Sequence, residues 1–131
     1  MSVVAKSGAP SSRAAEGAMT GARFKKSLQD GREVWIDGER VADVTTHPAF
    51  KDMIDALASV YDQQTTTYRD EMTFVDPESG VRTSLSWMLP HNAEELRKKR
   101  RNSELWSQLT WGQLGRSPDI LAPYIISTLH L

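Results

Sequence analysis

The dipeptide Asp37-Gly38 constrains the fold more than any other feature of the sequence. A two-residue hairpin with a type I′ turn needs positive φ at both central positions, and Asp-Gly is one of the few pairs that adopt it readily. Runs of strand-forming residues flank the pair on both sides. Thr45, Thr46 and His47 then offer helix caps, and Pro48 suits the first helical position because its missing N–H needs no partner there. The stretch 32–50 is therefore predicted to form a tight hairpin that leads directly into a helix.

Three segments carry the apolar periodicity of amphipathic helices. The middle segment has apolar side chains at positions i, i+4, i+7 and i+11, which predicts one buried stripe. The residues of this stripe are Phe50, Ile54, Leu57 and Tyr61. The third segment begins with Asn92 and Glu95, a capping-box pattern, and its expected buried residues are Leu96, Leu105, Trp106 and Leu109. The predicted helices cover residues 21–29, 48–62 and 93–111, and a largely apolar segment follows over 120–131.

A second hairpin is predicted between the last two of these helices. The polar stretch 63–70 is expected to be a loop. Residues 71–75 and 81–88 favour strands, and the turn-forming stretch 76–80 lies between them, with a proline to fix φ and a glycine to accept positive φ. A chain of 131 residues is long enough for one domain. The predicted fold class is therefore mainly α with two small β-hairpins.

Composition excludes several classes of function. A net charge of -1 gives no global field to attract nucleic acid or an acidic membrane. With 0 cysteines there is no disulfide framework, thiolate metal site or cysteine nucleophile. No apolar run approaches the length of a membrane span, and the N-terminus has no apolar signal segment. These features favour a cytoplasmic protein without nucleic-acid or membrane partners. Residues 1–18 are small and polar, and we expect them to form a disordered tail.

The clearest candidate for chemistry is the basic run 97–101 in the third predicted helix. Five consecutive residues pass all the way round a helix, so only some of them face inward. The expected inward-facing candidates are Lys99, Arg100 and Ser103. A buried cation needs a partner, because an unpaired buried charge is costly. One alternative is snorkelling or a salt bridge with the acidic residues at 70–71, and the other is an anion site for a phenolate or a carboxylate.

Other polar residues give weaker signals. No histidine has a second histidine or a carboxylate at metal-ligand spacing, and no serine lies in a nucleophile-elbow motif. Gly112 and Gly115 precede a predicted helix start and are compatible with an anion cradle, but no strand comes before them as a dinucleotide fingerprint requires. A close helix–helix corner is the favoured interpretation. We therefore expect no catalytic, cofactor-binding or metal-binding residue in this chain.

Three blocks of sequence resemble a known family. They are GREVWIDGERVADVTTHPAF, MTGARFKKSLQDG before it, and WGQLGRSPD near the end. In this order they are similar to the N-terminal part of the 4-hydroxyphenylacetate 3-monooxygenase family, the oxygenase components of two-component, reduced-flavin-dependent hydroxylases. The resemblance covers roughly residues 19–119. It implies the N-terminal helical domain of an acyl-CoA-dehydrogenase-like fold.

The resemblance also implies an activity for the full-length family, the hydroxylation of a phenol ortho to its hydroxyl group with reduced FAD from a separate flavin reductase. Residues 19–131 would then be an N-terminal domain truncated at its C-terminus, inactive alone, without a flavin site of its own. It would contribute to the substrate pocket and to the packing of a homodimer or homotetramer, and the missing C-terminal domains would be its partners. Two alternatives are a non-catalytic helical interaction module that uses the apolar C-terminal segment, and the N-terminal part of a related acyl-CoA dehydratase.

Some members of the resembled family hold the phenolic substrate with an arginine in this helix and a tyrosine four residues later. In the matching segment, Lys99 is followed by Ser103, and Arg100 by Glu104, so the tyrosine is missing. This departure puts 4-hydroxyphenylacetate itself in doubt as the substrate. The expected substrate-binding residues are Arg100, Lys99 and Ser103, with Arg100 first because only arginine offers a bidentate fork to a carboxylate.

Overall fold

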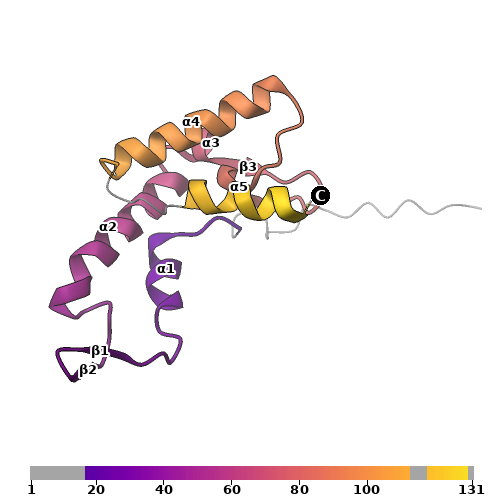
Figure 1. Cartoon of the computed structure of the whole chain (residues 1–131). Helices are drawn as coiled ribbons and strands as arrows, with labels where there is room; N and C mark the ends of the chain where they lie inside the picture. Colours follow the sequence, from indigo (N-terminus) through magenta and orange to yellow (C-terminus); the bar gives the residue numbers. More distant parts are fainter. Residues whose placement is uncertain (1–16, 113–117, 130–131) are drawn as a thin grey trace, which may run out of the picture.

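The computed structural model describes residues 17–112 and 118–129, and these are mainly helical with two separate antiparallel strand pairs (Figure 1). The predicted mainly α class with two hairpins is confirmed. The helices are α1 (Gly21–Ser27), α2 (Pro48–Thr65), α3 (Arg69–Met72), the short 3-10 helix η2 (Leu85–Trp87), α4 (Ala93–Leu109) and α5 (Pro118–Leu129). The strands are β1 (Val34–Ile36), β2 (Glu39–Val41), β3 (Thr73–Val75) and β4 (Arg82–Ser84).

The β1–β2 hairpin and the start of α2 form as predicted. Ile36 pairs with Glu39 across the turn, and both central residues have positive φ, 50° at Asp37 and 82° at Gly38. His47 caps α2, because its Nδ1 accepts a hydrogen bond of 3.2 Å from the Ala49 N–H. In Figure 1, α2 connects this hairpin to the part of the molecule formed by α3, α4 and α5.

The buried face of α2 differs from the predicted stripe. Ile54 is buried as expected, but Leu57 is only half-buried, and Val60 and Gln64 are buried instead. The helix also continues to Thr65, beyond the expected end at 62, so Gln64 belongs to it rather than to a loop. The reason is that α2 packs against two neighbours, α1 along its middle and α3 near its end, which rotates the buried surface along the helix.

The second hairpin is shorter than predicted. Residues expected at the start of its first strand form α3, which ends at Met72, and β3 begins at Thr73. The second strand stops at Ser84, where the Ser84 hydroxyl accepts from the Ser86 N–H and starts η2. The expectation of a strand over 81–88 is therefore wrong beyond residue 84, and Trp87 in η2 is 44% exposed.

The core is formed where α2, α3 and α4 meet. It contains Val60, Met72, Leu105 and Trp106, with Tyr61, Tyr68 and Leu109 packed against it. Leu96, predicted to be buried in the first turns of α4, is 59% exposed, so this part of the expected stripe is wrong. The segment after the core forms α5, with Ala122 and Ile126 buried and Tyr124 on the exposed face. None of the described helices is both long and apolar enough to cross a membrane.

An ion triad joins α1 to α2 and gives a first testable expectation. Asp55 forms salt bridges with Lys25 and Lys51, and these contacts, with Lys25 first, lower the pKa of Asp55 to about 2 from an ordinary value of 3.8. A depressed carboxyl pKa stabilises the fold at pH values above 3.8 and loses this contribution as the pH falls towards 2. We expect an NMR titration of the Asp55 carboxyl to have its midpoint near 2, and Lys25→Ala to raise it. Lys26→Ala is the control, and an Asp55 midpoint at 3.8 in the unmodified chain would rule out the triad.

Candidate functional site

The N-terminal half of α4 carries the candidate site residues. Two hydrogen bonds fix the start of this helix. The Asn92 side chain accepts a hydrogen bond of 2.9 Å from the Glu95 N–H, as the capping pattern predicted. Glu95 reaches back to accept from the His91 N–H at 2.8 Å, one residue earlier than in a standard capping box. The other end of α4 is anchored in the core by Trp106. Side chains between these two anchors are therefore held at defined angles around the helix.

Lys99 faces the segment that follows η2. Its Nζ donates a hydrogen bond of 2.7 Å to the backbone carbonyl of Met88, and the residue is half-buried. Burial lowers the pKa of Lys99 from its ordinary value. No carboxylate in the described part of the chain forms an ion pair with this ammonium group. Since an ammonium carries three donors, two N–H groups remain for a ligand or for water.

The other two predicted residues lie in different environments. Ser103 is half-buried beside Lys99, and its hydroxyl donates to the Lys99 carbonyl at 3.3 Å. Arg100 has 81% of its side chain exposed and pairs with Glu104 at 3.1 Å, so the prediction that it faces inward is wrong. The acidic partner predicted for the basic run is present, but it is Arg101 that reaches Glu71, at 2.7 Å. The error concerns which face of α4 is buried. That face contains Asn102 and Trp106, and the Arg100 side chain lies outside it.

Sequence reasoning missed a buried polar network beside Lys99. Asn102 donates through Nδ2 to the Ser86 hydroxyl at 3.0 Å, and Ser84 donates to the Gln64 side-chain oxygen at 3.1 Å. The Ser86 N–H contacts the Ser84 hydroxyl at 3.4 Å, so the network links α2, η2 and α4. Three buried atoms in the described chain have no hydrogen-bond partner; they are Gln64 Nε2, Asn102 Oδ1 and Trp106 Nε1. The only signal in the sequence was the spacing of Asn102, three residues after Lys99 and four before Trp106.

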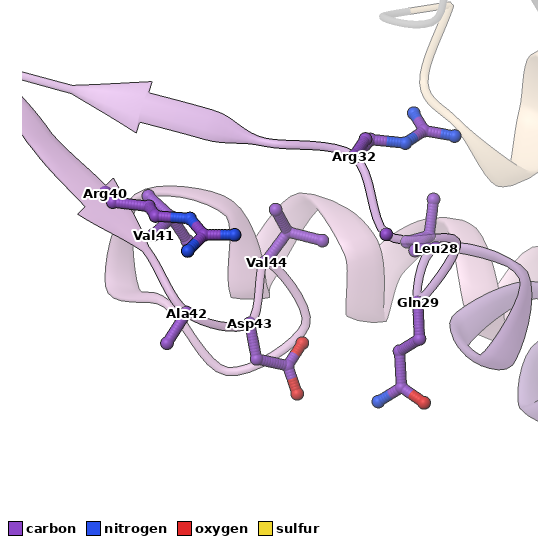
Figure 2. Close-up of a pocket in the computed structure, with 9 residues that line it drawn as sticks. Leu28, Gln29, Arg32, Arg40, Val41, Ala42, Asp43 and Val44 are labelled. Carbon is purple, nitrogen blue, oxygen red and sulfur yellow. The ribbon is translucent and has the colours of Figure 1, made fainter.

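A hollow lies at the base of the first hairpin, with a volume of about 570 Å³. Figure 2 shows the Gln29 and Asp43 side chains pointing to the same side of it. Asp43 accepts hydrogen bonds from Thr45 and Gln29, which lower its pKa. The two arginines at the rim are also engaged, one with Asp30 and the other with Glu33. Its charged groups are thus neutralised locally, and we assign it no chemistry. The lining residues are Leu28, Gln29, Gly31, Arg32, Arg40, Val41, Ala42, Asp43 and Val44.

Possible metal ligands and possible phosphate cradles are spread over different parts of the described chain. Across residues 17–112 and 118–129, no group of three His, Cys, Asp or Glu side chains is placed to hold a metal ion. Glycines with positive φ, which build phosphate cradles, lie at four separate turns and face open space. The first turns of α2 and α4 are capped by their own side chains. Gly112 has a φ of 68°, whereas the predicted corner at 113–117 lies outside the described residues.

Comparison with known proteins gives a family match and several similar proteins. The family model described as 4-hydroxyphenylacetate 3-hydroxylase N terminal matches residues 20–130. The pyoverdin chromophore biosynthetic protein PvcC of Pseudomonas aeruginosa is 42% identical over 107 residues, which are 82% of this chain and 21% of PvcC. The 4-hydroxyphenylacetate 3-monooxygenase oxygenase component of Escherichia coli is 41% identical over 107 residues, 80% of this chain and 21% of that protein.

Solved structures agree with the sequence relatives. The crystal structure of the oxygenase component HpaB of 4-hydroxyphenylacetate 3-monooxygenase complexed with FAD matches with a TM-score of 0.71 and 36% identity, and the match covers 79% of this chain and 22% of HpaB. This chain spans about a fifth of the length of the curated relatives that it matches. The resemblance carried by the three sequence blocks is confirmed, and the chain belongs to the 4-hydroxyphenylacetate 3-hydroxylase N-terminal family.

Proposed function

We propose that this chain acts as the N-terminal domain of the oxygenase component of a two-component hydroxylase that adds a hydroxyl group ortho to that of a phenol. The observation that carries the proposal is the family match over residues 20–130, together with relatives named as oxygenase components. The same relationship supports an acyl-CoA-dehydrogenase-like fold for the whole protein, a separate flavin reductase as a partner, a homodimer or homotetramer, and a cytoplasmic location. In this proposal the domain contributes to oligomer packing and is inactive alone.

The cofactor in this proposal is reduced FAD, because HpaB has been crystallised with FAD. When bound, the reduced flavin would activate molecular oxygen, one atom of which would enter the phenol and the other leave as water. We assign binding of the cofactor to parts of the protein outside the described residues. The role of the described residues is to hold and orient the phenol beside the flavin, which raises the rate by fixing the geometry of the reacting groups.

Lys99 is the residue that we propose for the substrate pocket. It is half-buried, it retains two N–H donors, and its depressed pKa reflects a partly desolvated cation. A charge-assisted hydrogen bond from such a group to a phenolate or carboxylate is stronger than a neutral one. Ser103 lies one turn further along α4 and is proposed as a second contact. Arg100 remains a weaker prediction, because its side chain points away from this face.

A chimera tests the proposal. The 107 matched residues of the Escherichia coli oxygenase component would be replaced by the matching residues of this chain. Product formation from a panel of phenols that includes 4-hydroxyphenylacetate would be followed with reduced FAD from a flavin reductase. We expect an active chimera, in which Lys99→Ala lowers kcat/KM about tenfold through loss of one charge-assisted hydrogen bond. Lys98→Ala is the matched control, because Lys98 is exposed and pairs with Glu94.

Two results would count against this function. A folded, FAD-binding chimera that makes no product would exclude the proposed role of the domain in hydroxylation. Equal kcat/KM values for the Lys99→Ala and Lys98→Ala chimeras would leave the domain assignment in place and remove Lys99 from the substrate pocket.

A further inference from the structure

A separate pocket of about 300 Å³ lies where the end of α2 meets α3 and the second hairpin. It shares no residue with the face of α4 described above. Two of its lining residues are arginines, two are threonines, and the fifth is a buried alanine. They are Arg69, Arg82, Thr65, Thr73 and Ala18. The pocket thus combines two permanent cations with a wall that has no acidic side chain.

Arg82 is held in this pocket by its surroundings. It lies in β4 opposite Val75, and its Nη1 donates a hydrogen bond of 3.0 Å to the Thr73 hydroxyl. Its backbone is fixed from the other side by Gly17, where an added Cβ would come within 2.2 Å of the Arg82 carbonyl oxygen. The residue is half-buried, and its guanidinium N–H groups donate to no carboxylate in the described chain. A partly desolvated guanidinium without a counter-charge is unfavourable, so this arrangement favours binding of an anion.

Arg69 adds the second cation. Its side chain is exposed and makes no hydrogen bond or ion pair within the described residues. Two nearby acids are engaged elsewhere. Asp62 accepts from the Gly21 N–H at 2.8 Å, and Glu71 pairs with Arg101 at 2.7 Å. The two guanidinium groups therefore face the pocket without local neutralisation, in a protein whose overall net charge is only -1.

We propose that this pocket binds a phosphate group, either as free phosphate or as part of a small phosphorylated molecule. Two guanidinium groups match the several oxygens of a tetrahedral phosphate, because each planar fork can donate two parallel N–H···O bonds. The hydroxyl of Thr73 donates to the Arg69 backbone carbonyl and accepts from Arg82, so it orients the arginine rather than the ligand. The inference is independent of the hydroxylation reaction proposed above.

Titration of the whole 131-residue chain with inorganic phosphate and pyrophosphate tests this site. The side-chain Nε–H signals of Arg69 and Arg82 would be followed by NMR at constant ionic strength. We expect saturable shifts with a Kd below about 1 mM. Arg69→Gln should weaken binding at least tenfold, and it leaves the fold intact because this side chain has no partner in the described residues. Arg40→Gln is the control, since Arg40 is exposed and pairs with Glu33.

The arms of the titration separate the possible outcomes. Tighter binding of pyrophosphate than of phosphate would indicate a phosphorylated molecule, and equal binding would indicate free phosphate. Acetate that binds as tightly as phosphate would overturn the phosphate assignment in favour of a carboxylate. Shifts that do not saturate by about 10 mM, ten times the expected Kd, would overturn the site altogether. An equal loss of phosphate affinity in Arg40→Gln and Arg69→Gln would do the same.

Discussion

Trp106→Ala should lower the free energy of unfolding by about 4 kcal/mol, the largest effect that we expect from a single substitution in this chain. Trp106 is 0% exposed and lies in the core cluster with Met72 and Leu105. Its ring also meets Tyr61 edge-to-face, with centroids 5.8 Å apart. Removal of the indole deletes this contact and leaves a cavity between α2, α3 and α4 that the surrounding helices fill only in part. Urea denaturation followed by circular dichroism measures the loss.

Trp111→Ala is the matched control for this prediction. Trp111 is 88% exposed, two residues beyond the end of α4, so the same chemical change removes almost no buried surface. We expect a change in the free energy of unfolding within about 0.5 kcal/mol. If the two alanine variants were equally stable, the core would not be centred on Trp106, and the packing of α4 described above would be incorrect. The shape of the two urea denaturation curves also shows whether the domain unfolds cooperatively.

The parts of the fold that were predicted correctly are those decided by local chemistry. The β1–β2 turn follows from the positive φ that Asp37 and Gly38 adopt, which depends on few neighbours. The starts of α2 and α4 follow from caps at His47 and Asn92, which satisfy N–H groups two or three residues away. Such signals lie within a few residues of one another. They can therefore be read from the sequence without knowledge of the tertiary structure.

The errors concern which side of a helix is buried, and this depends on distant partners. Leu96 fits the apolar stripe of α4 but lies beyond the region that α3 and η2 cover, so it is exposed. Gln64 and Asn102 are 0% exposed despite their polarity, because Ser84 and Ser86 supply hydrogen-bond partners from another element. A count of apolar residues cannot find such a network, since its members are polar and separated in the sequence.

The candidate site residues lie on one predicted helix, and the structure decides only which of their side chains are buried. The basic run pointed to the first half of α4, and Lys99 is the member of the predicted set that is partly buried. Arg100 was ranked first on chemical grounds, because arginine binds carboxylates in a bidentate way. Its orientation depends on the rotation of α4 about its axis, which is set by Asn102 and Trp106 in the core. The chemical argument therefore favours Arg100, and the burial of the side chains favours Lys99.

Gly21→Ala should lower the free energy of unfolding by about 2 kcal/mol through steric conflict between α1 and α2. An added Cβ at Gly21 would come within 2.5 Å of the Ala58 carbonyl oxygen and 2.6 Å of a carboxylate oxygen of Asp62. The second atom can move with its side chain, but the first belongs to the backbone of a helix and cannot. The Gly21 N–H also donates to Asp62 at 2.8 Å, so a displaced α1 would lose this hydrogen bond as well.

The Gly21→Ala variant has a control in the same helix and a second readout. Ala22→Ser changes the exposed neighbour of Gly21 and should alter the free energy of unfolding by less than about 0.5 kcal/mol. If α1 is pushed away from α2, the contact between the Phe24 and Tyr61 rings, whose centroids are 5.2 Å apart, should be lost together with its NMR ring-current shifts. Because the conflict with Ala58 involves its backbone, the double variant Gly21→Ala/Asp62→Ala should remain destabilised. Recovery of full stability in that double variant would mean that the carboxylate alone limits the approach of the two helices, contrary to the close backbone packing argued here.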